Sequence, residues 1–474
     1  MGSKFETRLL GELCHEITVG FVGTMTNEYI ENGIPFLRSK NIEEYDVKWD
    51  DMKYVSSAFH KKLSKSVLKP GDVAIVRTGK PGTTCVIPND LREANCSDIV
   101  IARVNNELLC PHYLSYFMNA MAHGQVNAHI VGAVQQHFNV SSAKKLEIPL
   151  PSRVKQTKIV QVLKTLDDKL KLNRQINQTL EQMAQTLFKS WFVDFDPVVD
   201  NALDAGFFEQ DLAFSDELLH RVEVRKAVRE SDNFKPLSED IRRLFPDAFE
   251  ECAEPALGLG GWVPSGWELG NLSDVTNILS GFAFKSNEFQ NSGFGVIKIK
   301  NIGNDKSVDI CDIQRIDISL AEKAKRFSLK DGDLLMAMTG ATVGKFGFLV
   351  TENQEPYYLN QRVAKFEAID ESTAYLYCIL NRKITESYIV NTAQGSAQPN
   401  ISAKDILAMP LITAPQSIRE LFNDKVNDSF QKIIQMRKQN IILEHLRDTL
   451  LPKLISGELS LSDIKIDIPE ETLI

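Results

Sequence analysis

"LKPGDVAIVRTG" occupies Leu68–Gly79, and the closely similar "LKDGDLLMAMTG" occupies Leu329–Gly340, at an offset of 261 residues (329 − 68). In both segments Gly-Asp precedes a run of apolar residues, and Thr-Gly follows it. Glycine favours tight turns, and short apolar runs between turns favour strands. The repetition predicts a strand between two turns in each copy of a duplicated domain, with Gly71 and Gly332 in the first turns.

Two further segments repeat at nearly the same offset. "FLRSKNI" (Phe36–Ile42) matches "VIKIKNI" (Val296–Ile302) at 260 residues (296 − 36). "QQHFNVSSAKKLEIPL" (Gln135–Leu150) matches "QPNISAKDILAMPL" (Gln398–Leu411), which aligns Asn139 with Asn400 and Pro149 with Pro410 at 261 residues. Such a steady offset indicates a duplicated domain. Strand-like and helix-like runs occur in both copies, so each is expected to be a mixed α/β domain.

Length and composition limit the class of protein. A chain of 474 residues is expected to form roughly three units at about 150 residues per domain. No segment approaches the ~18 consecutive apolar residues of a membrane span, and the N-terminus has no apolar signal-peptide core. The seven cysteines show no C-x-x-C spacing, which favours reduced thiols. We therefore expect a cytoplasmic protein without a membrane partner.

Charge is distributed unevenly along the chain. The net charge is −9, but Phe192–Ala256 alone contains 17 acidic and 7 basic residues. Between Ile34 and Lys80, ten basic residues outnumber six acidic ones. A basic face of this kind can follow a phosphate backbone, because the local field and not the total charge meets the nucleic acid. A solvated surface is the alternative for this basic segment.

Two long segments, one after each repeated domain, contain neither Gly nor Pro. They lie between Pro151 and Pro197 and between Pro415 and Pro452, and apolar residues recur in both at alternating spacings of three and four. This heptad pattern predicts two long helices that pair as a coiled coil, with an Asn at equivalent positions of both. Separate amphipathic helices, each packed on its own domain, are the alternative. The predicted spacer residues are Leu163, Leu166, Leu170, Asn177, Leu180, Ile433, Met436, Asn440 and Leu443.

The order of these elements predicts the architecture. The fold class is α/β (α+β), with two repeated mixed α/β domains separated by two long antiparallel coiled-coil helices in a pseudo-two-fold arrangement. The expected boundaries are 1–150, 151–262, 263–412 and 413–474. A helix from Ile159 to Leu187 spans roughly 42 Å at about 1.5 Å per residue. This length is comparable with one turn of B-DNA, about 34 to 36 Å, so the helices could hold two domains over neighbouring grooves.

Several motifs resemble one known family. They are "QTKIVQVLKTLDDKLKLNRQINQTLEQMAQTLFKSWFVDFDPV" (Gln156–Val198), "LFPDAFE" near Phe245, "VPSGWEL" (Val263–Leu269) and "LLPKLISGEL" (Leu450–Leu459). Together with the duplicated arrangement, they resemble the specificity subunit of a Type I restriction-modification system over essentially the whole chain. The resemblance implies two target-recognition domains, each of which recognises one half of a bipartite, asymmetric DNA sequence.

The resemblance also implies partners. Two modification (methyltransferase) subunits would bind the helical regions, and restriction/translocase subunits would join them on double-stranded DNA. S-adenosylmethionine, ATP and Mg would belong to those subunits, and none to this chain.

Three segments partly resemble catalytic or cofactor-binding motifs, but each lacks residues or spacing that the motif requires. "TGATVGKFG" encloses three residues between its glycines where a P-loop has four, and Phe346 replaces the Ser or Thr that binds magnesium. "LGLGGW" (Leu257–Trp262) lacks dinucleotide-binding spacing, and "DFDPV" (Asp194–Val198) lacks the second Pro and the aromatic residue of an adenine methyltransferase motif. The eight histidines form no helical metal pair. We therefore expect no enzyme, no cofactor site and no metal site.

Candidate DNA contacts lie in the repeated segments. Arg or Lys can pair with guanine, Asn or Gln can pair with adenine, and Thr or Lys beside glycines suits phosphate. At strand spacing, Arg38 and Lys40, or Lys298 and Lys300, would share one face. Turn residues are the alternative for the Asn and Gln positions. The candidates are Arg38, Lys40, Asn41, Arg77, Thr78, Lys80, Gln135, Gln136, His137, Asn139, Lys298, Lys300, Asn301, Thr339, Lys345, Gln398 and Asn400.

These features predict a non-catalytic DNA-recognition and assembly subunit. The alternative is a coiled-coil scaffold or adaptor without sequence-specific DNA binding. The acidic connector Phe192–Ala256 either docks a basic surface of a partner or forms a solvated linker.

Overall fold

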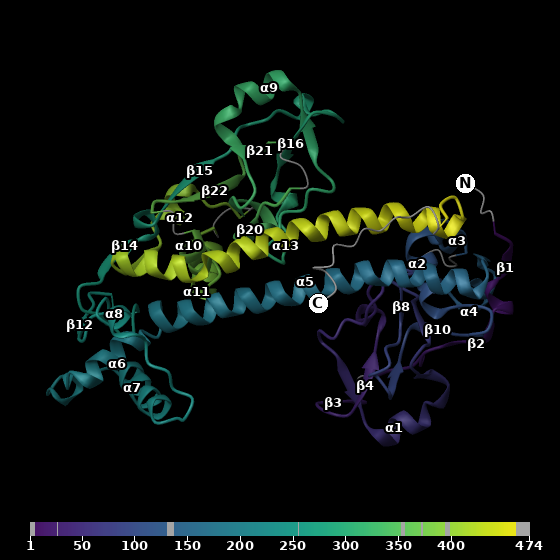
Figure 1. The fold of residues 1–474 in the computed structure, drawn as a ribbon, viewed down its shortest axis with the longest axis horizontal. Helices are drawn as coiled ribbons and strands as arrows, with labels where there is room; N and C mark the ends of the chain where they lie inside the picture. Colours follow the sequence, from purple (N-terminus) through teal and green to yellow (C-terminus); the bar gives the residue numbers. More distant parts are fainter. Residues whose placement is uncertain are drawn as a thin grey trace. The chain divides into compact units, whose positions relative to one another are not determined.

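The computed structural model describes residues 5–25, 27–129, 137–254, 256–351, 356–370, 373–393 and 399–460 (Figure 1). Gln135, Gln136 and Gln398 of the predicted site lie outside these residues. The chain divides into two compact units, each of which contains parts of both long helices. Unit 1 comprises Met1–Lys171 and Leu443–Ile474, and unit 2 comprises Leu172–Ile442.

Unit 1 contains two main sheets. The first is antiparallel and has the order β2 (Cys14–Val19), β10 (Ile99–Val104), β7 (Val73–Val76) and β8 (Thr84–Val86). The second has the order β3 (Tyr29–Ile30), β5 (Lys53–Val55), β4 (Ile34–Leu37), β9 (Ala94–Cys96) and β6 (Val67–Leu68). Within the second sheet, β4 and β9 run parallel to each other.

Unit 2 repeats all four strands of the antiparallel sheet and four of the five strands of the second sheet. Its antiparallel sheet has the order β15 (Thr276–Ser280), β22 (Val363–Ala368), β19 (Leu334–Ala337) and β20 (Phe346–Phe348). Its second sheet has the order β17 (Gln314–Ile316), β16 (Phe294–Ile297), β21 (Tyr357–Leu359) and β18 (Ser328–Leu329), with β16 and β21 parallel. The predicted duplication of a mixed α/β domain is confirmed.

The two repeated phrases form the predicted strand between turns. Gly71 and Gly332 adopt φ values of +87° and +85°, a conformation that glycine reaches at little cost. Both Asp residues that follow are buried, and each side chain accepts a hydrogen bond of 2.9 Å from a backbone N–H three residues earlier: Asp72 from Lys69, and Asp333 from Lys330. The apolar runs then form β7 and β19, which lie in the middle of their sheets.

Shorter elements complete each unit. In unit 1 they are β1 (Thr7–Leu9) paired with β11 (Glu147–Pro149), and the helices α1 (Ser57–Lys62), α2 (Pro111–Met121), α3 (His123–Ala128) and α4 (Val140–Lys144). In unit 2 they are β14 (Glu268–Asn271) paired with β23 (Pro410–Thr413), and the helices α9 (Ile318–Lys323), α10 (Thr373–Leu380), α11 (Lys383–Ala393) and α12 (Ala403–Leu407). Both α2 and α10 are buried in the main core of their unit.

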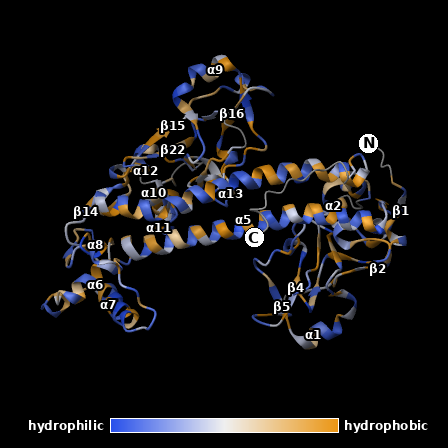
Figure 2. Cartoon of the chain, viewed as in Figure 1, coloured by the Kyte–Doolittle hydropathy of each residue, from blue (hydrophilic) through white to orange (hydrophobic). Residues whose placement is uncertain are grey.

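The two long helices are α5 (Arg153–Phe192) and α13 (Gln416–Ser456), and α13 continues through Pro452. Figure 2 shows apolar residues recurring among polar ones along both helices. In unit 1, Leu163 shares a core with Leu451 and Leu454. In unit 2, Asn173 contacts Asn440, and the ring of Phe188 lies 5.9 Å from that of Phe422. Residue numbers therefore increase along α5 in the direction in which they decrease along α13. The helices therefore pair antiparallel.

The acidic connector is a folded part of unit 2. It forms α6 (Asp196–Asp204), α7 (Asp216–Arg229), α8 (Glu239–Arg242) and β12 (Phe249–Glu251), which pairs with β13 (Trp262–Pro264). Phe195, Leu218 and Phe245 of this segment are buried in the same core as Phe188 of α5. The expectation of a solvated linker is therefore wrong, because the connector's aromatic residues anchor it to the core.

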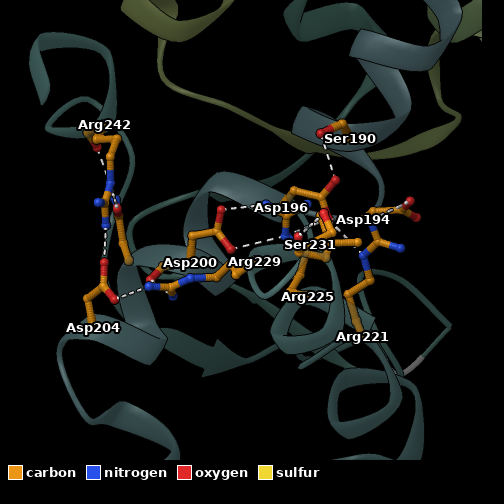
Figure 3. A network of polar contacts seen from close by, with 12 residues as sticks. Ser190, Asp194, Asp196, Asp200, Asp204, Arg221, Arg225, Arg229, Ser231 and Arg242 are labelled. Atoms are coloured by element: carbon orange, nitrogen blue, oxygen red, sulfur yellow. Dashed lines mark hydrogen bonds and ion pairs between the residues drawn. The ribbon is translucent and has the colours of Figure 1, made fainter. Parts of the chain in front are cut away.

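Ion pairs fasten α6 to α7 at one-turn intervals (Figure 3). Arg221 Nε donates to Asp196 at 2.8 Å and Arg225 Nε donates to Asp200 at 3.0 Å. Each arginine lies 25 positions after its aspartate, and the next pair in the series is Asp204 with Arg229. These acidic side chains are neutralised within the connector. Docking to a basic partner therefore depends on the connector's other acidic residues, and it stays a prediction.

Candidate nucleic-acid interface

In both units the parallel strand pair gathers loops at one edge of a sheet. In unit 1, Leu37 of β4 lies opposite Cys96 of β9, and both strands run in the same direction. Residues 38–41 and 97–98 therefore leave the sheet at the same edge. In unit 2, Ile297 and Leu359 are paired in the same way, and residues 298–301 and 360–362 follow them. We call the unit 1 and unit 2 loop sets edge 1 and edge 2.

Asp98 holds edge 1 together. Its carbonyl oxygen accepts a hydrogen bond of 2.7 Å from Ser39 Oγ, and its carboxylate accepts one from the hydroxyl of Thr78. Arg77 Nη1 lies 3.5 Å from the same carboxylate. The predicted residues Arg77 and Thr78 are thereby brought against the turn that contains Arg38 and Lys40. The acidic residue that joins them was not among the predicted site residues.

The segment 137–139 also joins edge 1. The backbone N–H of Phe138 donates to the carbonyl of Arg77 at 3.1 Å, and Arg77 Nε donates to the carbonyl of Phe138 at 3.3 Å. His137 is half-buried, and its Nδ1 has no hydrogen-bond partner among the described residues. Asn139 lies at the N-cap of α4, where its side-chain oxygen accepts from the N–H of Ser142 at 2.8 Å. Its role as a base reader is not supported, because capping occupies that oxygen.

Asn41 and Asn301 were predicted to contact DNA, but the structure places both side chains in the interior of their turns. Asn41 is fully buried, accepts from the N–H of Arg38 at 3.1 Å and donates to the carbonyl of Lys48 at 3.1 Å. Asn301 is buried and bonds in the same way to the N–H of Lys298 and the carbonyl of Asp309. Both amides are used to close a turn, which removes them from the groups available to a base.

The predicted alternating strand spacing of the nearby cations is also wrong. Strand β4 ends at Leu37 and β16 ends at Ile297, and a 3₁₀ turn follows each: Ser39–Asn41 and Ile299–Asn301. The buried Asn side chains cap these turns and stop the strands. Lys40 and Lys300 therefore project from turns instead of from a strand face.

A cationic cluster surrounds one carboxylate at edge 1. Asp51 contacts Arg38, Lys40 and Lys53, and its distances to Arg38 and Lys53 are 3.4 Å and 2.9 Å. Hydrogen bonds from Lys40 and Lys53 hold the pKa of the Asp51 carboxyl well below its usual range. Three positive charges against one negative charge leave the cluster with a net positive charge, which suits contact with phosphate.

Edge 2 holds its lysines differently. Lys298 Nζ lies 3.6 Å from the centre of the Phe289 ring, a cation–π distance, and it also contacts Gln314. Burial and the neighbouring Lys300 lower the pKa of Lys298. Lys300 pairs with the exposed Asp312 at 2.7 Å. Both lysines are therefore partly engaged by their own domain.

The corner of edge 2 that corresponds to Asp98 has different residues. Ser97 and Asn360 are equivalent, since each forms a β-bridge with a Phe that follows an equivalent strand: Phe21 after β2, and Phe282 after β15. One residue, Asp98, separates Ser97 from β10, whereas Gln361 and Arg362 separate Asn360 from β22. The alignment of the two sequence repeats did not identify this corner as a candidate site, because the second copy has one additional residue here. The different lengths of the two loops between matched strands are the signal that would have found it.

Gln361 and Arg362 open onto a hollow of about 340 Å³. Its other walls are Met338, Thr339, Pro399 and Asn400. Arg362, Gln361 and Asn400 are exposed, while the buried Thr339 hydroxyl has no hydrogen-bond partner among the described residues. The predicted residues Thr339 and Asn400 are thus brought together, with their backbones bridged to each other.

The predicted equivalence of Asn139 and Asn400 is wrong by two residues. Phe138 donates its N–H to the carbonyl of Arg77, and Ile401 donates to that of Met338 at 3.0 Å. Phe138 and Ile401 are therefore equivalent, and so are the residues that precede them, His137 and Asn400. Asn139 is then equivalent to Ser402, and both cap a helix: Ser402 Oγ accepts from the N–H of Asp405 at 3.1 Å. Helix capping, not base recognition, is what the two positions share.

The remaining predicted phosphate contacts lie in the loops between β7 and β8 and between β19 and β20. Lys80 is exposed, and Lys345 is half-buried. Neither ammonium forms an ion pair with a described residue. Both follow a glycine with positive φ, Gly79 or Gly344, so each loop is tightly turned where its lysine projects.

The predicted spacer residues lie on the paired helices. Leu163, Leu170 and Ile433 are buried, and Leu166, Leu180, Met436 and Leu443 are half-buried. Asn177 and Asn440 are 7% and 9% exposed. Asn440 is bonded to Asn173, whose Nδ2 lies 2.8 Å from the Asn440 side-chain oxygen.

No group of metal-binding side chains and no helix long and apolar enough to span a membrane occurs within the described ranges. Two copies of an α/β domain, each with cations at one sheet edge and joined to paired helices, define a two-domain nucleic-acid-recognition protein. The family profile described as "Type I restriction modification DNA specificity domain" matches residues 2–182 and 264–448. The chain belongs to this family, which agrees with the resemblance seen in its motifs.

Individual relatives support the family. The Type I restriction enzyme HindI specificity subunit of Haemophilus influenzae is 29% identical over 420 residues, 84% of this chain and 88% of that protein. The MjaIX specificity subunit of Methanocaldococcus jannaschii is 23% identical over 447 residues, 93% of this chain and 90% of that protein. The solved S subunit of a Type I restriction-modification system from M. genitalium aligns with a TM-score of 0.54 at 14% identity, covering 95% and 96% of the two chains. That structure supports the fold.

Proposed function

We propose that this chain is the DNA sequence-specificity subunit of a Type I restriction-modification system. Each unit recognises one half of a bipartite, asymmetric target, and the paired helices set the distance between the halves. The observation that carries the proposal is the duplication of a complete loop edge, each with cations beside a parallel strand pair. Because the loops differ between the copies, two unlike half-sites are expected.

The chain acts in this proposal without catalysis of its own. Two methyltransferase subunits would bind the helical regions and supply S-adenosylmethionine chemistry, and restriction/translocase subunits would supply ATP- and Mg-dependent chemistry. The complex would work in the cytoplasm, where its DNA is found. Support comes from the family membership.

The competing function is a coiled-coil scaffold that does not read DNA sequence. The two functions differ in binding to duplex DNA. A sequence reader should select particular duplexes from a random library, and its affinity should fall steeply as salt rises. Binding releases condensed cations from the phosphates, and this release gains less free energy at high salt. The test is selection with the full chain assembled with its cognate modification subunit. Recovery of no consensus at any salt concentration would favour the scaffold.

A further inference from the structure

We propose that Arg362 reads a guanine in the half-site bound by unit 2, with Gln361 beside it on the neighbouring base. The inference rests on the proposed function and names one base contact and its reader. It starts from the corner at which the two edges differ most: Asp98 at edge 1, and Gln361-Arg362 at edge 2.

Edge 1 closes this corner. The Asp98 carboxylate is occupied by the Thr78 hydroxyl and by Arg77, and Arg77 also donates to the carbonyl of Phe138. Arg77, which follows β7, therefore uses its side chain to connect three loops of its own domain. Its side chain is only 17% exposed, so the corner offers DNA little free hydrogen-bonding capacity.

Edge 2 leaves the same corner open. The strand-end position of Arg77 is taken by Met338, whose N–H donates to the carbonyl of Arg362 at 3.0 Å. This bond fixes the backbone of Arg362, while its guanidinium stays exposed and forms no hydrogen bond or ion pair with a described residue. The nearby cations Lys298 and Lys300 have partners of their own, Gln314 and Asp312. Arg362 is therefore the readily available cation at this corner.

The shape and chemistry of the hollow suit a base edge. Arginine can donate two hydrogen bonds to the O6 and N7 atoms of guanine, and glutamine can pair with adenine in the same groove. Thr339 and the exposed Asn400 also line the hollow beside Arg362. An arginine that contacts only phosphate would need neither this fixed backbone nor these neighbours.

The test uses the full chain with its cognate modification subunit and a library of duplexes with random positions. Wild-type protein should recover two half-sites, one of which contains an invariant guanine. Arg362→Ala should lose the preference at that one position and lower the affinity for the wild-type target by roughly 5- to 150-fold, as expected for one lost bidentate contact. Arg326→Ala, which removes another exposed arginine of unit 2, is the matched control and should keep every preference.

The outcomes are separable. Unchanged base preferences with a uniform loss of affinity and a shallower salt dependence would overturn the inference and assign Arg362 to phosphate. Loss of preference in both half-sites at once would also overturn it. Recovery of no consensus by the wild-type complex would instead contradict the proposed function. The half-site read by unit 1 should be recovered unchanged in every variant, because Arg362 does not belong to that unit.

Discussion

The side-chain amide of Asn173 on α5 donates to the side-chain oxygen of Asn440 on α13 across a distance of 2.8 Å. The same amide donates to Gln439 at 2.8 Å, while the Asn173 oxygen is buried without a partner among the described residues. A polar layer of this kind costs stability within an apolar seam and favours one register of the two helices. We infer that this layer fixes how the helices align.

The first prediction concerns this layer. Asn173→Leu should destabilise the chain by about 1 to 3 kcal/mol, because the oxygens of Asn440 and Gln439 lose their donor in a buried site. Adding Asn440→Leu should recover most of that loss, since two apolar side chains then face each other. Urea denaturation measures both, and Gln178→Leu on the exposed side of α5 is the control. A double variant as unstable as the single one would contradict the loss of hydrogen-bond donors as the cause of the destabilisation.

The second prediction concerns the connector. Asp196 is 7% exposed, accepts a hydrogen bond of 2.7 Å from Ser190 and pairs with Arg221. Asp196→Ala should cost about 1.5 to 3 kcal/mol, because Arg221 then keeps only Asp194, at 3.3 Å, and the Ser190 hydroxyl loses its acceptor. Glu239→Ala breaks an exposed pair with Arg243 and should change the unfolding midpoint far less. Equal effects of the two changes in thermal denaturation would refute the structural role assigned to the Asp–Arg series.

Much of the fold could be predicted from the repeats, because chain duplication preserves patterns that are local in sequence. Gly71 and Gly332 indicated turns, and the heptads indicated α5 and α13. The turns after β4 and β16 could not be predicted in this way. Arg38 and Lys40 alternate as they would on a strand, and only the burial of Asn41 explains why the strand stops before them.

The candidate site was harder to predict because its residues meet through tertiary structure. Aligning Asn139 with Asn400 maximised identity, yet the backbone hydrogen bonds of Phe138 and Ile401 shift the equivalence by two residues. Asp98 and Arg362 were not among the predicted site residues for a related reason. The loop that separates the matched strands is one residue longer in the second copy, and sequence similarity is lowest where the two domains must differ.

The third prediction separates phosphate contacts from base contacts. Lys80→Ala and Lys345→Ala should each weaken binding to all duplexes by a similar factor, because a phosphate carries no sequence information. Each should also make the slope of log affinity against log salt shallower by about 1. Fluorescence anisotropy with target and unrelated duplexes over a salt series measures both effects. A change in base preference would instead place the lysine in a groove.

The fourth prediction concerns the cations that follow β4 and β16. Arg38→Ala should weaken recognition of one half-site only and Lys298→Ala that of the other, each by about 1 to 3 kcal/mol if a base contact is lost. Arg38 shares Asp51 with Lys40 and Lys53, so its removal also frees that carboxylate to repel phosphate. Binding to duplexes altered in one half-site at a time distinguishes the cases. A uniform loss with a shallower salt slope would assign these residues to phosphate.

The last prediction tests whether the helices act as a ruler. Four residues added after Asn173 in α5 lengthen the helix by about 6 Å and keep it nearly in phase, since a turn takes 3.6 residues. Because α13 runs antiparallel to α5, a second insertion of four residues after Gln439 is needed to keep Asn173 opposite Asn440. An insertion in α5 alone should shift the seam and destabilise the protein.

The doubly lengthened chain should require one to two additional base pairs between unchanged half-sites, because base pairs of B-DNA are spaced about 3.4 Å apart. The half-sites should stay the same, since their readers lie in the loop edges and not on the helices. Selection from a library with variable spacing measures the preferred spacer, and four residues inserted beside the exposed Asp232 in the connector provide a control of equal length. A doubly lengthened chain that folds, binds and still prefers the original spacing would mean that contacts other than the paired helices set the distance between the two recognition domains.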